Sequence, residues 1–385
     1  MVIGIPKETM PGESRVSATP ETVSEMVKSG ATVLVEKSAG KGAFLSDESY
    51  IAAGAVIVED CEEIFEKSDV ILKVKEPQYN AEKGCSEIDL MHSGQYLIAF
   101  LHPASPANHP MVKEMARKGI IGLTLDGIPR ISRAQNMDAL TSMSTCAGYK
   151  GILMAASMLP KFVPQIVCAA GFIRPSNVMV IGAGVAGLQA IATARRLGAV
   201  VYAADIRPEA AEQAKSLGAR IVDTGVPSEI AVGEGGYAKP LPEEWMVKER
   251  DALKETISKM DIVFCSALVP SRLAPVLVTE EIVESMQPGS VIVDISIDQG
   301  GNCAITVPGE ITNKHGVTIL GIKNIPGILP VSSTWMFAKN VCNLFKYLTK
   351  DNQIVLDLND EIVAGILTTY NGEIVHVGAR EAMGI

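Results

Sequence analysis

The sequence predicts an α/β fold with two doubly wound parallel-sheet domains, the second inserted in the first. Short runs rich in Val and Ile alternate with helical patterns, which favours parallel strands joined by helical crossovers. The chain of 385 residues is long enough for two or three hydrophobic cores. A second series of such runs begins after a long helical pattern, and this restart indicates a second domain.

The first series of elements begins with a strand over residues 2–5, which ends at Pro6. The next helix starts near Thr19, a favourable N-cap, with Pro20 at its first position and Gly30 just past its end. The same alternation of apolar runs and helical patterns predicts further strands over residues 32–35, 55–58, 70–74, 97–100 and 120–123.

A long helical pattern over residues 138–159 leads to the second series. Two separate series of strands require two sheets, so we infer that the second series forms its own domain. Its strands are predicted over residues 178–181, 200–204, 262–264, 291–294 and 318–320.

After Pro326 the pattern returns to one helix, residues 332–348, and to weak strand signals at residues 354–356 and 362–367. This last piece is too small for a domain, so we expect it to pack back on the first one. The predicted domains are therefore a discontinuous α/β domain, residues 1–128 and 329–385, and a second α/β domain inserted in it, residues 129–328.

Charge and cysteine content exclude several classes of protein. The net charge of −10 argues against nucleic-acid binding or an anionic membrane surface, since both need clustered Lys and Arg. The seven cysteines are scattered without a CxxC pair, which predicts no metal site and suits a reducing cytoplasm. The longest apolar stretch, residues 178–194, is interrupted by glycines, and no signal peptide opens the chain. We therefore expect a cytoplasmic chain that does not itself insert into a membrane.

Residues 224–240 form a long segment without a helical or strand period. The segment contains four glycines and two prolines. Long loops inside compact domains are often lids over a site, and the alternative is a disordered surface excursion.

The strongest motif is a GxGxxG turn between a predicted strand and a helix. Its glycines allow the backbone N–H groups of a helix N-terminus to approach a pyrophosphate, which predicts a Rossmann-like domain. The alternative is that they serve helix–strand packing alone. The turn comprises Gly182, Ala183, Gly184, Val185, Ala186 and Gly187.

Asp205 closes the next predicted strand, 18 residues after Gly187. A carboxylate there accepts hydrogen bonds from a ribose 2′-hydroxyl and repels a 2′-phosphate, which favours NAD(H) over NADP(H). Arg207 leaves NADP(H) as an alternative cofactor, because an arginine near this position can hold a 2′-phosphate. Ile206, Arg207 and Asn324 complete the predicted cofactor-binding residues.

Three further stretches carry a family resemblance: residues 129–140 (PRISRAQNMDAL), 187–194 (GLQAIATA) and 235–239 (GGYAK). With them the chain resembles, over essentially its whole length, the alanine dehydrogenase and nicotinamide nucleotide transhydrogenase superfamily. In transhydrogenases the first stretch contacts the nicotinamide through an arginine, a glutamine and an aspartate, which fall here on Arg130, Gln135 and Asp138. The third stretch closes over bound NAD(H) and places a tyrosine, here Tyr237, against the cofactor.

The resemblance implies the NAD(H)-binding component of a proton-translocating transhydrogenase, a translocase. Hydride would pass directly to or from NADP(H) held by a partner subunit, while a membrane subunit moves protons. Arg130 and Gln135 would orient the nicotinamide, and Tyr237 would help to exclude water. The resemblance also implies a homodimer and attachment at the inner membrane through the partner subunits. For Arg130 and Asp138 the alternative is an ordinary salt bridge at a helix start.

Four polar residues match the alanine dehydrogenase branch instead: Arg15, Lys75, His102 and Asp298. In that branch the arginine and lysine hold a 2-oxo acid, the histidine is the general acid and base, and the aspartate supports the amine chemistry. Taken singly, each residue is more typical of a structural role, but together the four match the alanine dehydrogenase pattern. The second hypothesis is therefore a self-sufficient NAD-dependent alanine dehydrogenase-type enzyme, and the third is a non-catalytic NAD(H)-binding sensor. Of these three hypotheses, we favour the transhydrogenase component.

Overall fold

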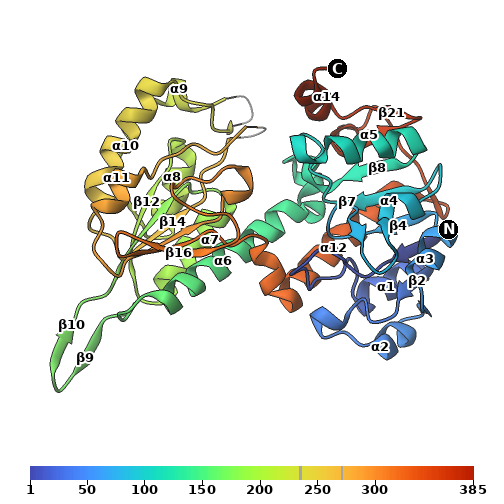
Figure 1. Ribbon diagram of the computed structural model, residues 1–385, viewed down its shortest axis with the longest axis horizontal. Coiled ribbons are helices and arrows are strands. Elements are labelled where there is room, and N and C mark those ends of the chain that lie inside the picture. Colours follow the sequence, from blue (N-terminus) through green and yellow to red (C-terminus); the bar gives the residue numbers. More distant parts are fainter. Residues whose placement is uncertain (234–235, 270–271) are drawn as a thin grey trace. The chain divides into compact units, whose positions relative to one another are not determined.

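The computed structural model describes residues 1–233, 236–269 and 272–385. The chain forms two compact units (Figure 1): unit 1 contains Met1–Met143 and Pro326–Ile385, and unit 2 contains Ser144–Ile325. The first boundary falls later than the predicted 128/129, because residues 129–138 belong to the packing of unit 1. Within that unit Asn340 donates a hydrogen bond to the carbonyl of Asn136 at 2.9 Å.

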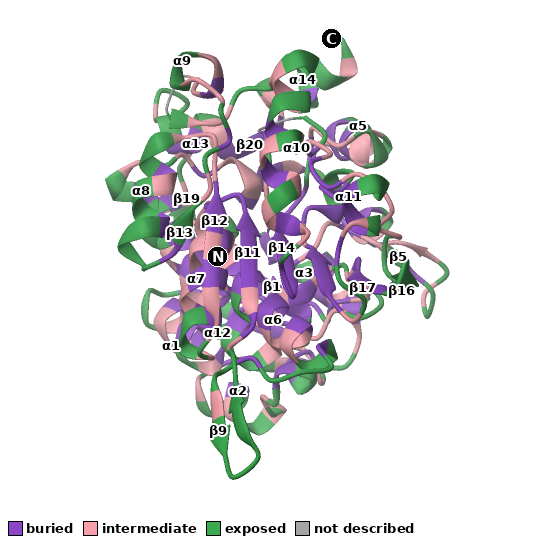
Figure 2. Cartoon of the chain, turned by 90° about the vertical axis from the view of Figure 1, so that its left-hand side faces the viewer, coloured by how far each residue is buried: buried purple, intermediate pink, exposed green. Residues whose placement is uncertain are grey.

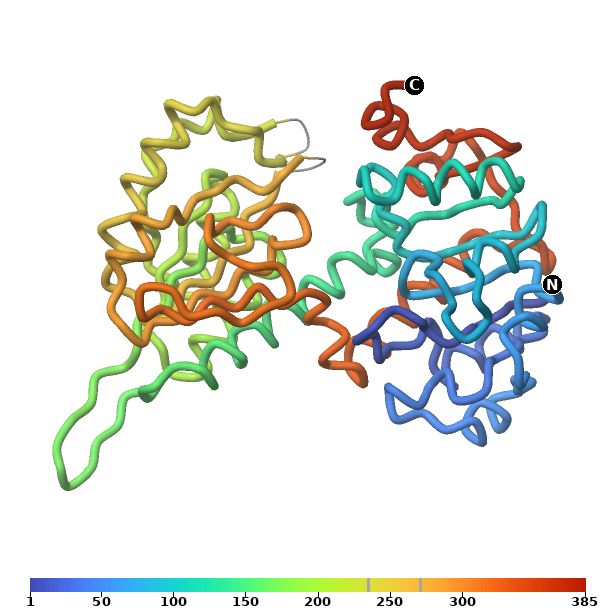
Figure 3. Tube along the Cα trace, viewed as in Figure 1, coloured from blue at the N-terminus to red at the C-terminus, as the bar shows by residue number. Residues whose placement is uncertain are grey.

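Unit 1 contains an eight-stranded sheet in the order β21-β20-β8-β7-β4-β1-β2-β3. The strands β1, β2, β3, β4, β7 and β8 are parallel, whereas β20 and β21 run antiparallel at one edge. These two edge strands come from the C-terminal segment, which lies along the N-terminal portion of the chain in Figure 3. The strands are β1 (Val2–Ile5), β2 (Thr32–Glu36), β3 (Val56–Val58), β4 (Val70–Leu72), β7 (Tyr96–Ala99), β8 (Ile121–Thr124), β20 (Leu367–Tyr370) and β21 (Glu373–Ile374).

The helices of unit 1 pack against this sheet, and the first of them begins where its capping residue predicts. Thr19 accepts a hydrogen bond from the N–H of Thr22, and Pro20 is the first helical residue, which confirms the predicted helix start. The helices are α1 (Pro20–Lys28), α2 (Asp47–Ala52), α3 (Cys61–Lys67), α4 (Glu87–Leu90), α5 (His109–Lys118), α12 (Pro330–Leu348), α13 (Glu361–Ile366) and α14 (Val377–Met383).

Shorter elements complete unit 1. Two small antiparallel hairpins pair β5 with β6 and β18 with β19. Four short 3₁₀ helices lie in the loops between the main elements. The bounds are β5 (Tyr79–Asn80), β6 (Cys85–Ser86), β18 (Thr349–Lys350), β19 (Gln353–Ile354), η1 (Lys41–Ala43), η2 (Pro106–Asn108), η3 (Leu125–Gly127) and η4 (Ser132–Met137), with η7 (Ile325–Ile328) at the junction to unit 2.

The predicted strand over residues 362–367 is wrong. The side chain of Asp360 accepts hydrogen bonds from the N–H groups of Ile362 and Val363, so these residues begin the helix α13. The strand β20 follows only from Leu367. The apolar run was too short to distinguish a buried helix from a strand.

Unit 2 contains a seven-stranded sheet in the order β13-β12-β11-β14-β15-β17-β16. All of its neighbours are parallel except β16 and β17. The predicted strands of both series occur to within two residues of their expected bounds. The strands are β11 (Asn177–Ile181), β12 (Val200–Ala204), β13 (Arg220–Ile221), β14 (Ile262–Cys265), β15 (Val291–Asp294), β16 (Ile311–Lys314) and β17 (Val317–Leu320).

Both faces of this sheet are covered, so its central strands are buried (Figure 2). Val178 and Val180 of β11 face one apolar cluster, and Met179 and Ile181 face the other, as strand alternation requires. A hairpin of β9 (Ile166–Cys168) and β10 (Gly171–Ile173) stands out from the unit and is exposed. The helices are α6 (Ala139–Met158), which starts in unit 1, and α7 (Val185–Arg196), α8 (Pro208–Ser216), α9 (Ser228–Ala231), α10 (Glu243–Ile257) and α11 (Glu280–Glu284), with η6 (Ile297–Gln299). Among the described residues, no helix has the length and apolar character needed to span a bilayer.

Candidate functional site

The order of strands in unit 2 places a ligand crevice at the end of β11. The chain moves from β11 to β12 and β13 on one side, and from β14 to β15 and β17 on the other. The strand order therefore reverses between β11 and β14, and in open α/β sheets ligands bind outside the carboxyl ends of the strands at such a point. The predicted glycine turn and Asp205 follow β11 and β12 directly at this edge.

The glycine turn joins β11 to α7 and fits a bound diphosphate. A Cβ atom at Gly182, whose φ is +88°, would lie 2.7 Å from the backbone nitrogen of Ala267, and one at Gly187 would lie 1.9 Å from the carbonyl oxygen of Gly182. Gly184, by contrast, faces open space, since a Cβ there would meet no atom within 4 Å. No side chain caps α7 at this residue, so the N–H groups of its first turn, with Val185 and Ala186, remain available to an anion.

Asp205 and Arg207 form an ion pair at the end of β12. The Asp205 carboxylate accepts hydrogen bonds from the Ala183 N–H at 2.8 Å, from the Arg207 N–H at 2.8 Å, and from Arg207 Nε and NH2 at 2.9 and 2.7 Å. These four donors occupy the acceptor positions of a carboxylate. The hydrogen bonds to Asp205 raise the pKa of Arg207. A further donor could therefore reach Asp205 only by replacing one of these groups, such as the Arg207 guanidinium.

A cavity of about 350 Å³ adjoins this pair. Arg207, Pro208 and Glu209 line it on one side, and Ser228, Val232 and Gly236 line it on the other. Two of the predicted features, the residues after β12 and the long loop 224–240, thus meet at one hollow of unit 2. Ile206 lies between Asp205 and Arg207 on the same loop.

The loop 224–240 contains the short helix α9 and an antiparallel bridge between Val232 and Ala238. The Gly233 N–H donates to the Tyr237 carbonyl at 2.8 Å, and Tyr237 itself is half-buried. Gly235 of the GGYAK stretch lies outside the described residues.

The loop after β14 forms the other wall of the glycine turn, and nothing in the sequence predicted it. Ser266 Oγ donates to the carbonyl of Gly182 at 2.8 Å. The buried Asn302 accepts from the Ala267 N–H at 2.9 Å and donates to the carbonyls of Ala267 and Pro275, both at 2.8 Å. Asn302 is thus the residue that shapes this loop.

Asp298 and Asn324 follow the strands β15 and β17 of unit 2. Asp298 lies in η6 with 61% of its side chain exposed, and its Oδ1 is 3.9 Å from Nζ of Lys323. Asn324, next to that lysine, has a positive φ of 52°, which asparagine adopts more readily than most residues. Both therefore lie beyond the carboxyl ends of strands, where a site of this fold is expected.

The stretch that carries Arg130, Gln135 and Asp138 lies in unit 1. Asp138 caps α6, because its Oδ1 accepts from the Thr141 N–H at 2.8 Å and its Oδ2 from the Thr141 hydroxyl at 2.6 Å. Arg130 and Gln135 are exposed. Arg133, which the sequence did not single out, anchors the stretch by ion pairs with Asp360 and Glu361, at 2.7 and 2.9 Å.

Arg15 is buried and pairs with Glu13. Its guanidinium pairs with both carboxylate oxygens of Glu13, and its NH1 lies 2.9 Å from the sulfur of Met143. Only 2% of the Arg15 side chain is exposed. Glu13 thus balances the charge of Arg15, and a substrate carboxylate would have to replace Glu13 to bind the guanidinium.

His102 forms a dyad with Asp126, a residue that the sequence analysis missed. His102 Nδ1 lies 2.7 Å from Asp126 Oδ1, and the other carboxylate oxygen accepts from the His102 N–H at 2.7 Å and from the Thr124 hydroxyl at 2.6 Å. Burial alone would lower the pKa of His102, but the charge and hydrogen bond of Asp126 outweigh it and raise the pKa. Lys75 is near enough for its positive charge to oppose this rise. A histidine oriented in this way is equipped for proton transfer.

The backbone beneath Lys75 is held by a buried ionic cluster. Lys73 Nζ lies 3.2 Å from a carboxylate oxygen of Glu8 and 3.2 Å from one of Glu87, and all three side chains are buried. Glu8 also accepts from the N–H groups of Val74 and Lys75, at 2.6 and 3.4 Å. The cluster therefore determines where the segment after β4 places Lys75.

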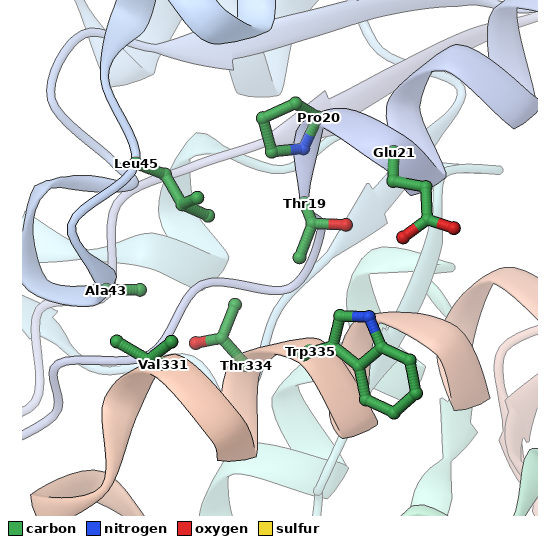
Figure 4. A pocket seen from close by; sticks show the side chains of 8 residues that line it. All are labelled: Thr19, Pro20, Glu21, Ala43, Leu45, Val331, Thr334 and Trp335. Carbon is green, nitrogen blue, oxygen red and sulfur yellow. The ribbon is translucent and has the colours of Figure 1, made fainter.

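A second cavity, of about 260 Å³, lies in unit 1 between the starts of α1 and α12 (Figure 4). Thr19, Glu21, Thr334 and Trp335 are among the residues that line it. Its polar groups serve the fold, since Thr19 caps α1 and Glu21 pairs with Lys339 at 2.7 Å. This cavity contains none of the predicted site residues.

The predicted site residues thus fall into two sets. Unit 2 brings together the glycine turn, the pair Asp205–Arg207 and the loop with Tyr237, whereas unit 1 brings His102 near Lys75. The first set suits a dinucleotide, and the second suits proton transfer.

Comparison with known proteins supports one family. The family models for the N-terminal and C-terminal domains of alanine dehydrogenase/PNT match residues 4–147 and 151–377. The chain is 42% identical over 379 residues to the first section of the alpha subunit of NAD(P) transhydrogenase from Rhodospirillum rubrum, covering 98% of both chains. It is 31% identical to an alanine dehydrogenase of Methanococcus maripaludis, covering 99% of this chain and 96% of that one. The solved structure of a transhydrogenase from Sinorhizobium meliloti matches with a TM-score of 0.85 and 37% identity, covering 97% of this chain and 100% of that one.

Proposed function

The chain belongs to the alanine dehydrogenase/PNT family of oxidoreductases, and we propose that it is the NAD(H)-binding component of a proton-translocating NAD(P) transhydrogenase. In this role it passes hydride between its own NAD(H) and NADP(H) held by a partner subunit. The observation that carries the proposal is the open space at Gly184 above an uncapped helix N-terminus, at the point where the strand order reverses.

The glycine turn, Asp205, Arg130, Gln135 and Tyr237 each have a physical task in this proposal. The N–H groups of the turn from Gly182 to Gly187 bind the diphosphate. Asp205 accepts hydrogen bonds from the ribose hydroxyls after the Arg207 guanidinium has moved away from it. Arg130 and Gln135 orient the nicotinamide, whose C4 supplies or receives the hydride, and Tyr237 covers it. Hydride transfer requires the two nicotinamides in near contact and water excluded.

The partners in this proposal are an NADP(H)-binding subunit and a membrane subunit. The name of the Rhodospirillum rubrum relative designates only one section of an alpha subunit, which implies further subunits for that protein. We propose the same for this chain, together with a homodimeric state and attachment to the membrane through its partners alone.

The test is hydride exchange with and without the partner. The purified chain is mixed with NADPH and an NAD analogue whose reduced form absorbs at its own wavelength. We expect reduction of the analogue only after the NADP(H)-binding subunit is added. Binding of NADH without any exchange in the reconstituted mixture would contradict the proposal.

A second candidate function, reductive amination of a 2-oxo acid, is favoured by the dyad of His102 and Asp126 beside Lys75. In this function a substrate carboxylate would have to displace Glu13 from Arg15, since the two side chains are paired. Oxidation of NADH by the chain alone, with pyruvate and ammonium, tests this function. Turnover that disappears in Lys75→Ala and in His102→Ala would favour it over the transhydrogenase.

A further inference from the structure

The stretch 129–138 of unit 1, which carries Arg130 and Gln135, is built on the 3₁₀ helix η4. No side chain caps the start of η4. Helices of this kind have poorer hydrogen-bond geometry than α-helices and are seldom longer than three or four residues. Ala134 and Met137 of η4 are buried, whereas Arg130 and Gln135 are exposed. The position of these two exposed side chains therefore depends on the elements that hold the stretch from outside.

One face of α12 holds the end of η4. The side chains of Asn340, Asn343 and Tyr347 follow one another at intervals of three and four residues, which places them on the same face of that helix. The amides of Asn340 and Asn343 both donate to the carbonyl of Asn136, at 2.9 and 3.0 Å. Because two donors of α12 share this carbonyl, the end of η4 is fixed to α12.

Arg133 fixes the start of η4 to the same face of α12 and to α13. Its NH1 donates to the hydroxyl of Tyr347 at 2.6 Å and to Asp360 Oδ2 at 2.7 Å, and its NH2 donates to Glu361 Oε1 at 2.9 Å. The Tyr347 hydroxyl donates in turn to Asp360 Oδ2 at 2.7 Å. A planar guanidinium bonded to three side chains is fixed in orientation as well as in position. We call these four residues the Arg133 clamp.

The acceptor at the centre of the clamp is itself held in place. The second oxygen of Asp360, Oδ1, accepts from the N–H groups of Ile362 and Val363, at 2.7 and 3.3 Å. Asp360 is therefore both the N-cap of α13 and the partner of Arg133. Through this one carboxylate the C-terminal segment of unit 1 determines where η4 lies.

The clamp is better suited to positioning than to stabilising the fold. The side chains of Arg133 and Glu361 are 46% and 59% exposed, and ion pairs in contact with water contribute little to stability. Arg133 lies three residues after Arg130 and two before Gln135, so a shift of its backbone moves both. Hydride transfer is sensitive to such shifts, since a misplacement of about 1 Å can cost about 100-fold in rate.

We propose that Arg133 is a positioning residue for hydride transfer, which holds Arg130 and Gln135 where they orient the nicotinamide. This inference rests on the proposed function. It adds that the C-terminal segment takes part in the reaction through Tyr347 and Asp360, although neither residue belongs to the stretch. Loss of the clamp should slow the hydride step while the chain stays folded and still binds NADH.

The experiment measures hydride exchange between NADPH and the NAD analogue, with the full chain and saturating amounts of both cofactors and of the NADP(H)-binding subunit. Arg133→Met removes the guanidinium and keeps an unbranched side chain. We expect the maximal rate to fall at least about tenfold, with the dissociation constant of NADH and the melting temperature close to the wild-type values. Arg133→Lys keeps the charge without the fork of two nitrogens, so it should recover part of the rate.

A matched control and a double variant make the result specific. Arg117→Met breaks another exposed arginine pair of unit 1, in which Arg117 binds both carboxylate oxygens of Glu114, and it should keep the wild-type rate. Tyr347→Phe removes one partner of the clamp and should cause a smaller loss than Arg133→Met. The variant with both changes should be no slower than Arg133→Met alone, because the hydroxyl acts through the guanidinium.

Three outcomes would overturn the inference and leave the proposed function intact. They are a wild-type rate in Arg133→Met, additive losses in the double variant, and a loss of rate matched by an equal loss of NADH affinity or accompanied by a much lower melting temperature. The last outcome would give Arg133 a role in the fold alone. A wild-type mixture that exchanges no hydride would overturn the proposed function and this inference with it.

Discussion

The guanidinium of Arg207 closes on the carboxylate of Asp205, with Nε and NH2 at 2.9 and 2.7 Å from its two oxygens. The pair bears on the choice of cofactor. Arg207, which could hold a 2′-phosphate, is bound to Asp205, whose negative charge would repel that phosphate. In the proposed function, selectivity for NAD(H) would depend on Asp205 in two ways. Asp205 would accept the ribose hydroxyls, and it would keep Arg207 away from the 2′ position.

Asp205→Asn is therefore expected to weaken NADH binding and to improve NADPH binding. Loss of hydrogen bonds to a buried charged group costs about 1.5–3 kcal/mol, or roughly 10- to 100-fold in the dissociation constant of NADH. NADPH gains because Arg207 is released. Titration of both cofactors with Asp205→Asn, and with Asp251→Asn as an exposed control, measures the effect. An unchanged ratio of the two dissociation constants would refute this role of Asp205.

Replacement of Asp126 by Asn should lower the pKa of His102, since burial lowers it and Asp126 is the main group that raises it above the ordinary value. Because the folded-state pKa exceeds the unfolded one, protonated His102 stabilises the fold below about pH 6.5, and this stabilisation is lost as the pH rises through the folded pKa. Asp126→Asn should thus reduce thermal stability more at pH 6 than at pH 9. Titration of the histidine ring by NMR and melting curves at both pH values test this, with the exposed Glu82→Gln as control. An equal loss at both pH values would contradict the dyad.

Glu8→Gln is expected to destabilise the protein strongly. It leaves the fully buried ammonium of Lys73 with Glu87 alone, and removal of one partner from a buried ion pair typically costs about 3–5 kcal/mol. In urea denaturation, the first unfolding transition of this variant should occur at a lower urea concentration than in the wild type. Glu59→Gln breaks an exposed pair with Lys37 and should have little effect. Equal stability of the two variants would mean that the Lys73 cluster does not hold its segment.

The main elements could be predicted because local chemistry determines them. Apolar runs of the right length occur as buried strands, and Thr19 and Pro20 do begin a helix. The glycine turn was recognisable because all its determinants lie within a few residues of each other. Residues 362–367 were misjudged because the deciding residue, Asp360, precedes the apolar run and acts through its side chain.

The contacts that complete the sites could not be predicted, because only the fold brings them together. Glu8 and Lys73 are 65 positions apart, and nothing near either residue indicates the other. His102 was singled out by resemblance, but its partner Asp126 lies on the next strand's loop without any motif.

Two alanine substitutions in the glycine turn should separate packing from binding. In Gly187→Ala the new Cβ would lie 1.9 Å from the carbonyl oxygen of Gly182, so the helix α7 must move away from β11. Overpacking of this kind costs about 1–3 kcal/mol, and the melting temperature should fall. In Gly184→Ala the Cβ meets no protein atom within 4 Å, and the backbone has an ordinary φ of −74°, so stability should be kept.

The same Gly184→Ala methyl would occupy the space where the diphosphate approaches the backbone, so NADH binding should weaken by at least about tenfold, the equivalent of about 1.4 kcal/mol. Melting curves and NADH titration on both variants give the comparison, with each variant serving as the control of the other. If Gly184→Ala bound NADH as tightly as wild type, the diphosphate would have to lie away from the turn. The glycines would then serve only the packing of α7 against β11, which is the alternative that the sequence left open.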